Sequence, residues 1–125
     1  MRVTGLTGCA TPAELAARRT DSSVSVRLAA VVALRRLRAA EVASFLADAD
    51  PLVVQEAALA IHDERGVPAA LPALAATLDR RPANEFVARR AINAGLRLGT
   101  PEAATRLLEV GLDANARAEL RTADR

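Results

Sequence analysis

The sequence contains no lysine, tryptophan or tyrosine, and only two phenylalanines, one cysteine and one histidine in 125 residues. The scarcity of aromatic side chains excludes a bulky core. The 30 alanines, 17 leucines and 11 valines instead predict close packing of small aliphatic groups. The lone Cys9 excludes an internal disulfide. Charges interrupt every apolar run well short of the about 20 residues that a membrane span needs, and residues 1–12 lack the hydrophobic segment of a signal peptide.

The charge balance is close to neutral, because 17 arginines face 15 carboxylates and leave a formal net charge of +2. A protein that binds nucleic acid mainly through charge has a larger basic excess, and one that stacks bases uses aromatic side chains. Nucleic-acid binding is therefore the weaker expectation for this composition. The length of 125 residues predicts a single domain, residues 1–125.

An internal repeat is the clearest pattern in the chain. The segment Val26–Leu34 recurs 27 residues later at Val53–Ile61, and again 34 residues further on at Val87–Gly95. Each copy begins with valine and carries alanine four and seven residues later, which places these residues on one face of an α-helix. The repeat predicts three related helices.

Capping signals divide the chain into helices. Thr11, Asp50 and Thr100 each precede a proline, as an N-cap precedes the first helical position, and Gly66 and Gly99 follow helical patterns as C-terminal stops. No segment alternates with a period of two, so no strand is expected. The expected helices cover residues 12–20, 23–38, 40–48, 51–63, 68–79, 84–98, 101–111 and 114–122.

These helices group into pairs joined by short turns, and units of about 30 residues cannot bury an apolar face alone. The expected fold is all-α: a short right-handed α-solenoid of about four helix pairs. The units cover residues 11–38, 39–65, 66–99 and 100–125, of which the last is shortened.

The segment from Asp21 to Leu34 resembles the HEAT repeat of the bacterial HEAT-like kind, and the resemblance extends over nearly the whole chain. It implies a ladder of hydrogen bonds between a turn aspartate and an arginine six residues later. Asp21 and Arg27 match this spacing, whereas the second unit has Asp48 but Val54 at the arginine position.

A narrower resemblance is carried by residues 41–51, 56–63 and 89–100. These segments are similar to the HEAT segment of large bacterial membrane-bound dehydrogenases that also contain c-type haem domains. The resemblance implies a spacer or docking module whose redox chemistry lies elsewhere, because the sequence has no Cys-x-x-Cys-His motif. Such a fragment would belong to the cell envelope, whereas a free-standing chain is expected in the cytoplasm.

No catalytic, cofactor-binding or metal-binding residues are expected, and the chain is interpreted as a non-enzyme. His62 lies at a helix end without a nucleophile or metal-ligand partners at a useful spacing. Asp48 and Asp50 occupy positions where helix caps use the same side chains. The six glycines form no phosphate-binding motif.

The arginine distribution suggests a partner-binding surface on the concave face formed by the second helices. On residues 23–38 a basic stripe lies opposite much of the predicted core, and the repeat offsets extend it along the next two helices, where it becomes apolar. The alternative is that these arginines form only a solvated helix face. The predicted surface comprises Arg27, Val31, Arg35, Arg38, Ala58, His62, Arg65, Ile92 and Leu96.

The sequence thus favours a non-catalytic scaffold for interactions between proteins or domains, without cofactors or direct membrane contact. A HEAT spacer of a dehydrogenase remains open, and nucleic-acid binding is the less favoured alternative.

Overall fold

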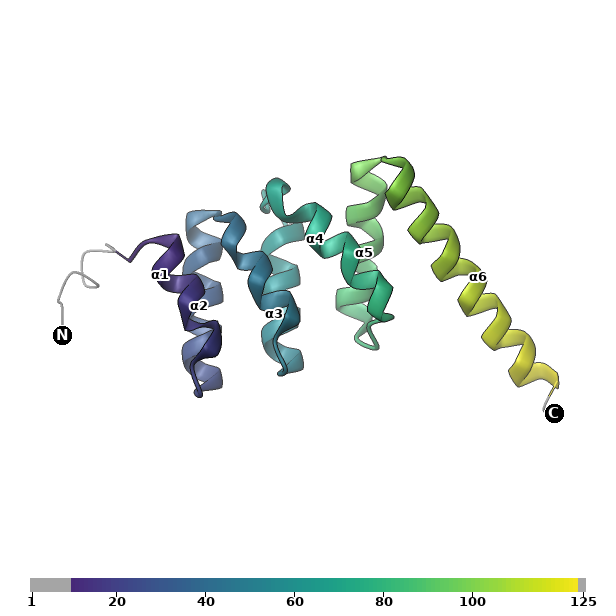
Figure 1. Ribbon diagram of the computed structural model, residues 1–125, viewed down its shortest axis with the longest axis horizontal. Helices are drawn as coiled ribbons and strands as arrows, with labels where there is room; N and C mark the ends of the chain where they lie inside the picture. The colour runs from purple at the N-terminus through teal and green to yellow at the C-terminus, as the bar shows by residue number, and fades with distance from the viewer. Residues whose placement is uncertain (1–9, 124–125) are drawn as a thin grey trace.

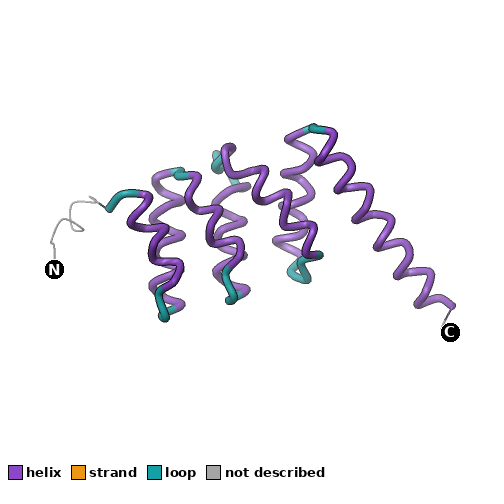
Figure 2. The backbone as a smooth tube through the Cα atoms, viewed as in Figure 1, coloured by secondary structure: helices purple, strands orange, loops and turns teal. Residues whose placement is uncertain are grey.

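The computed structural model describes the backbone of residues 10–123 and the side chains up to residue 119. This part of the chain is all-helical and contains no strand (Figure 2), as predicted. Its α-helices are α1 (Pro12–Ala16), α2 (Val24–Leu37), α3 (Pro51–His62), α4 (Leu71–Ala76), α5 (Glu85–Leu98) and α6 (Pro101–Ala123). Short 3-10 helices are η2 (Ala17–Thr20), η3 (Ala40–Ala47), η4 (Pro68–Ala70) and η5 (Thr77–Arg80).

Helices α2, α3 and α5 lie side by side, and α1, η3 and α4 pack against them from one side (Figure 1). We call α2, α3 and α5 the second helices, because each follows a shorter helical segment in the chain. Helix α6 meets α5 near its own N-terminus and then diverges from the rest (Figure 1). Within the described residues, no helix combines the length and hydrophobicity that crossing a bilayer requires.

The predicted N-caps Thr11, Asp50 and Thr100 are confirmed. Thr11 and Glu14 form a capping box, in which the Thr11 hydroxyl accepts from the Glu14 amide at 3.1 Å and the Glu14 carboxylate accepts from the Thr11 amide at 2.9 Å. Asp50 accepts from the Leu52 amide at 2.8 Å and begins α3. Gly99 ends α5 in the left-handed conformation, as expected of a C-terminal glycine.

One predicted break between helices is wrong, and the predicted helices 12–20, 40–48 and 68–79 consist partly or wholly of 3-10 helix. The segment 40–48 is the 3-10 helix η3 rather than an α-helix, and the segments 101–111 and 114–122 form the single helix α6. A lone glycine at 111 costs a helix only about 1 kcal/mol, which is too little to end it without a proline. Asp113, which lies in the gap predicted between these two segments, is inside α6, and its carboxylate accepts from Arg81.

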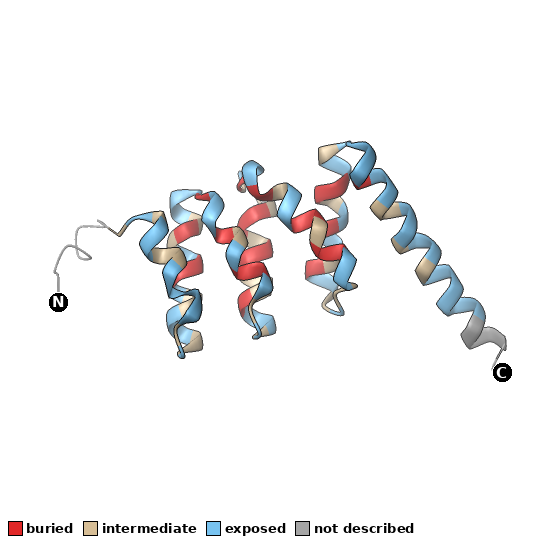
Figure 3. Ribbon diagram, in the orientation of Figure 1, coloured by how far each residue is buried: buried red, intermediate tan, exposed pale blue. Residues whose placement is uncertain are grey.

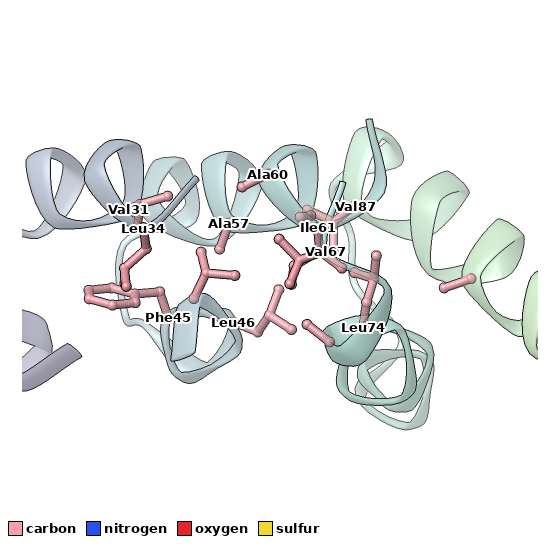
Figure 4. Close-up of a cluster of buried hydrophobic side chains, with 14 of the residues drawn as sticks. Val31, Leu34, Phe45, Leu46, Ala57, Ala60, Ile61, Val67, Leu74 and Val87 are labelled. Carbon is pink, nitrogen blue, oxygen red and sulfur yellow. The ribbon is translucent and has the colours of Figure 1, made fainter. Parts of the chain in front are cut away.

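The core follows the internal repeat. The first repeated alanine of each copy, at Ala30, Ala57 and Ala91, is at most 3 % exposed and lets neighbouring helices approach closely. Phe45 of η3 and Ile61 of α3 are among the largest fully buried side chains (Figure 4). Burial is concentrated between the second helices and the segments packed on them, whereas most of α6 is exposed (Figure 3).

Arginine side chains connect successive helix pairs through contacts that span 21 to 35 residues of sequence. Some of these guanidinium groups bind carboxylates and others bind backbone carbonyls. The ion pairs join Arg27 to Asp48, Arg90 to Asp63, Arg106 to Asp79 and Arg81 to Asp113. The carbonyl contacts join Arg38 to Gly66, Arg80 to Leu46 and Arg97 to His62.

Candidate functional site: an arginine-lined hollow

The structure brings part of the predicted surface together, but two residues of that surface are buried in the core. Val31 and Ala58 are 1 % and 0 % exposed, so their assignment to a partner-binding face is wrong. Both belong to the core cluster between neighbouring helices. The equivalent residue of α5 is Ile92, which is 36 % exposed because no further second helix follows α5.

Arg27 is a structural residue rather than a free cation. Its Nε and Nη2 donate to the two carboxylate oxygens of Asp48 at 2.9 and 3.3 Å. Its Nη1 donates to the backbone carbonyl of Asp21 at 2.7 Å. Arg27 therefore joins the turn of the first helix pair to the turn of the second, and its side chain is only 13 % exposed.

Three predicted arginines, Arg35, Arg38 and Arg65, lie around one hollow of about 340 Å³ between the C-terminal ends of α2 and α3. A fourth, Arg36, lines the same hollow and was missed in the sequence. The apolar part of the wall includes Val32 and Ala60. Sequence reasoning would have found Arg36 if the exposed face of this helix had been assigned one residue later. That face then contains Val32 and Arg36 in place of Val31 and Arg35.

The backbone around the hollow is unusual. Arg38 and Glu64 both have positive φ angles, 52° and 50°, although neither is a glycine. Gly66, which also lines the hollow, has φ 57°. Left-handed backbone at bulky residues costs energy and often marks functional sites. Arg38 takes this conformation as the C-cap of α2, and its Nε donates to the Gly66 carbonyl at 3.3 Å.

The guanidinium groups of Arg35, Arg36 and Arg65 have no hydrogen bond or ion pair with the described residues. Arg90 provides a contrast, because its Nε and Nη2 donate to Asp63 at 2.8 and 3.1 Å. The Asp63 carboxylate also lines the hollow, but its charge is balanced by Arg90 of α5.

The other carboxylate that lines the hollow is the exposed Glu64. Because Asp63 is balanced by Arg90, the four guanidinium groups of the hollow face only the negative charge of Glu64. The C-terminal ends of α2 and α3 each contribute roughly half a negative charge from their carbonyl groups. These partial charges offset only part of the arginine excess. The hollow therefore carries a positive potential and favours an anionic ligand or side chain.

The pKa of Asp63 is held below its ordinary value, mainly by the hydrogen bonds from Arg90 and further by His62, against the opposing effect of burial. A lowered folded-state pKa stabilises the protein above about pH 4, and this contribution is lost as the pH falls through the folded-state pKa.

We expect Asp63→Asn to lower the free energy of unfolding by about 1 kcal/mol at pH 6, and the difference from the parent to shrink towards pH 3. Urea denaturation across that range measures both values. A stability difference that stays constant with pH would contradict the assigned role of the carboxylate.

His62 does not line the hollow. Its Nδ1 lies 2.9 Å from the Asp63 Oδ1, and its Nε2 is buried without a hydrogen-bond partner among the described residues. The described residues contain no group of three histidine, cysteine, aspartate or glutamate side chains arranged to hold a metal ion. Cys9 lies outside the described residues.

Ile92 and Leu96, predicted as the apolar end of the surface, belong to α5 and are 36 % and 65 % exposed. Neither lines the arginine hollow, so the predicted surface divides into a basic part at α2 and α3 and an apolar part at α5. Comparison with protein-family models, curated proteins and solved structures found no match to the chain.

Proposed function

We propose that this protein is a HEAT-like repeat scaffold, a short right-handed α-solenoid of about four helix pairs, that binds an acidic segment of another protein or domain without catalysing a reaction. The arginine-lined hollow is the proposed docking site. The observation that carries the proposal is that Arg35, Arg36 and Arg65 converge there without carboxylate partners. The arginines that join helix pairs elsewhere bind carboxylates or backbone carbonyls.

The repeat architecture is supported by positional equivalence along the chain. Ala30, Ala57 and Ala91 recur at the repeat offsets and are all buried. The Arg27–Asp48 ion pair links the turns of successive units, which resembles the ladder implied by HEAT repeats. Between the second and third units, Val54 occupies the position of the ladder arginine. There the side-chain amide of Asn84 donates to Gln55 at 2.8 Å, which provides an uncharged contact between the units.

Arginine suits this role because its planar guanidinium group binds a carboxylate through two parallel hydrogen bonds. An extended acidic segment could place successive carboxylates along the hollow, while the exposed side chain of Val32 would pack against its side-chain stems. The site is open to solvent, so we expect affinity that falls as salt rises.

The test uses a fluorescein-labelled peptide of ten glutamates and measures fluorescence polarisation at low salt. Reversing two charges with Arg35→Glu and Arg65→Glu should weaken binding at least tenfold, because each change removes an attraction and adds a repulsion. The matched control reverses Arg18 and Arg19 to glutamate, two exposed arginines on η2 that do not line the hollow.

An equal loss in the control with Arg18→Glu and Arg19→Glu would show that net charge alone governs binding and would contradict the proposed site. A single-stranded oligonucleotide of the same charge is measured in parallel. Tighter binding of the oligonucleotide, with the same dependence on Arg35 and Arg65, would replace the acidic segment by nucleic acid as the partner.

A further inference from the structure

An exposed aromatic side chain, Phe86, stands in the first turn of α5, the helix that follows α3 along the row of second helices (Figure 1). The sequence has one other phenylalanine, the buried Phe45, and neither tryptophan nor tyrosine. Phe86 is 59 % exposed. Exposure alone indicates little, because folded proteins expose many apolar side chains. The contacts of Phe86 are more informative.

Arg90 connects Phe86 to the wall of the arginine-lined hollow. The guanidinium carbon of Arg90 lies 5.8 Å from the centre of the Phe86 ring, within the range of a cation–π contact. The same guanidinium group donates to both carboxylate oxygens of Asp63, a residue that lines the hollow. About 4 Å separates a guanidinium carbon from a bound carboxylate oxygen, so the ring lies within about 10 Å of the hollow wall.

Phe86 and Asp63 also share one face of the second helices. The repeat offset of 34 residues places Phe86 at the position of Leu52 in α3, which is 50 % exposed. Asp63 follows Leu52 by eleven residues, close to three helical turns, and therefore lies on the same side of α3. An extended chain that leaves the hollow past Asp63 can follow this face to Phe86.

The charges beside Phe86 are balanced, unlike those in the hollow. Glu85 pairs with Arg89 at 3.7 Å, and Arg90 pairs with Asp63. The surface around the ring therefore favours an uncharged apolar group, whereas the hollow favours carboxylates. This change from basic to apolar surface occurs over about 10 Å, the length of about three residues of extended chain.

We propose that the acidic segment bound by the hollow also carries an aromatic side chain, which packs on Phe86 about three residues away from the nearest carboxylate. This inference rests on the proposed docking function and specifies its partner more closely. The carboxylates bind the free arginines, the short spacer crosses the Asp63–Arg90 ion pair, and the aromatic group covers the exposed ring of Phe86.

The experiment compares two fluorescein-labelled peptides by fluorescence polarisation. Both contain six glutamates and a Gly-Ser-Gly spacer, followed by phenylalanine in one and serine in the other. We expect the phenylalanine peptide to bind the parent protein about fivefold more tightly, as an added aromatic pair predicts. Equal affinities of the two peptides for the parent would overturn the proposal.

Phe86→Ala should remove this fivefold advantage and leave the affinity of the serine peptide unchanged, which also shows that the variant is folded. The matched control is Leu108→Ala, which removes an exposed apolar side chain of α6 that does not line the hollow. The control should retain the advantage. If both variants lose it equally, or if neither does, the assignment of Phe86 is wrong.

A third peptide, in which phenylalanine directly follows the glutamates, tests the spacing. It should bind no more tightly than the serine peptide, because the Asp63–Arg90 pair separates the hollow from the ring. An advantage as large as that of the spaced peptide would contradict the proposed path from the hollow to Phe86.

The variant with Arg35→Glu and Arg65→Glu separates this inference from the docking function. Loss of binding of both peptides, without any advantage from phenylalanine in the parent, would refute only the contact with Phe86. Unchanged binding of both peptides would refute the docking function itself.

A nucleic acid is the competing partner, because its phosphates would bind the arginines and a base would stack on the Phe86 ring. The peptide is favoured because proteins that bind single strands stack successive bases on several aromatic side chains, and this chain exposes one phenylalanine. A thymidine oligonucleotide of equal charge is measured in parallel. Tighter binding of the oligonucleotide, lost in Phe86→Ala, would overturn the proposal.

Discussion

Asp48→Ala is expected to lower the free energy of unfolding by about 3 kcal/mol, because it removes one partner of a largely buried ion pair. The Asp48 side chain is 5 % exposed and binds Arg27 through both oxygens. It also accepts from the Asp50 amide, which orders the turn before α3. The substitution leaves the guanidinium group of Arg27 with only the Asp21 carbonyl.

Urea denaturation of the parent and the variant measures this loss, and Asp79→Ala is the matched control. Asp79 also pairs with an arginine of a neighbouring unit, Arg106 at 3.0 Å, but its side chain is 61 % exposed. We expect a loss below about 1 kcal/mol for that surface pair. Equal losses at the two aspartates would mean that burial does not determine the strength of these contacts.

Gly66→Ala is the second substitution with a large expected effect, again about 3 kcal/mol. Gly66 has φ 57°, a conformation that costs an L-residue roughly 1 to 2 kcal/mol. An added Cβ would also collide with the Ile61 carbonyl oxygen. That oxygen accepts from the Val67 amide at 2.9 Å, so relieving the collision would weaken the hydrogen bond that closes the turn after α3.

Gly99→Ala separates the two contributions. Gly99 has φ 60°, nearly the same conformation, but no atom lies within 4 Å of an added Cβ. We expect a loss of about 1 kcal/mol from backbone conformation alone. Thermal unfolding of both variants provides the comparison, and a Gly99 variant as unstable as the Gly66 variant would show that the collision with Ile61 contributes nothing.

The features that sequence reasoning predicted well are local. The caps at Thr11 and Asp50 involve residues within a few positions of one another, so the residue types alone indicate them. The buried alanines follow from a helical period that is visible in each copy of the repeat. These interactions depend little on how the helices are placed in three dimensions.

The candidate site depended on tertiary placement and was predicted only in part. The spacing of apolar residues predicts which side of a helix lies opposite the core. It does not predict which of the two adjoining sides the next helix covers. Val31 and Ala58 were assigned to an open face for this reason, and Arg36 was missed. The contact of Arg81 with Asp113 spans 32 residues and leaves no local signal.

The order in which the helices pack also bears on how quickly the chain folds. The principal contacts join segments that are near in sequence, such as α2 with α3 and α4 with α5. Closing such short loops loses little chain entropy, and all-helical domains of this kind reach the native state in microseconds to milliseconds. Phe45 and Ile61 are fully buried near the middle of the described chain, so we expect their contacts to form early and the outer helices to add on either side.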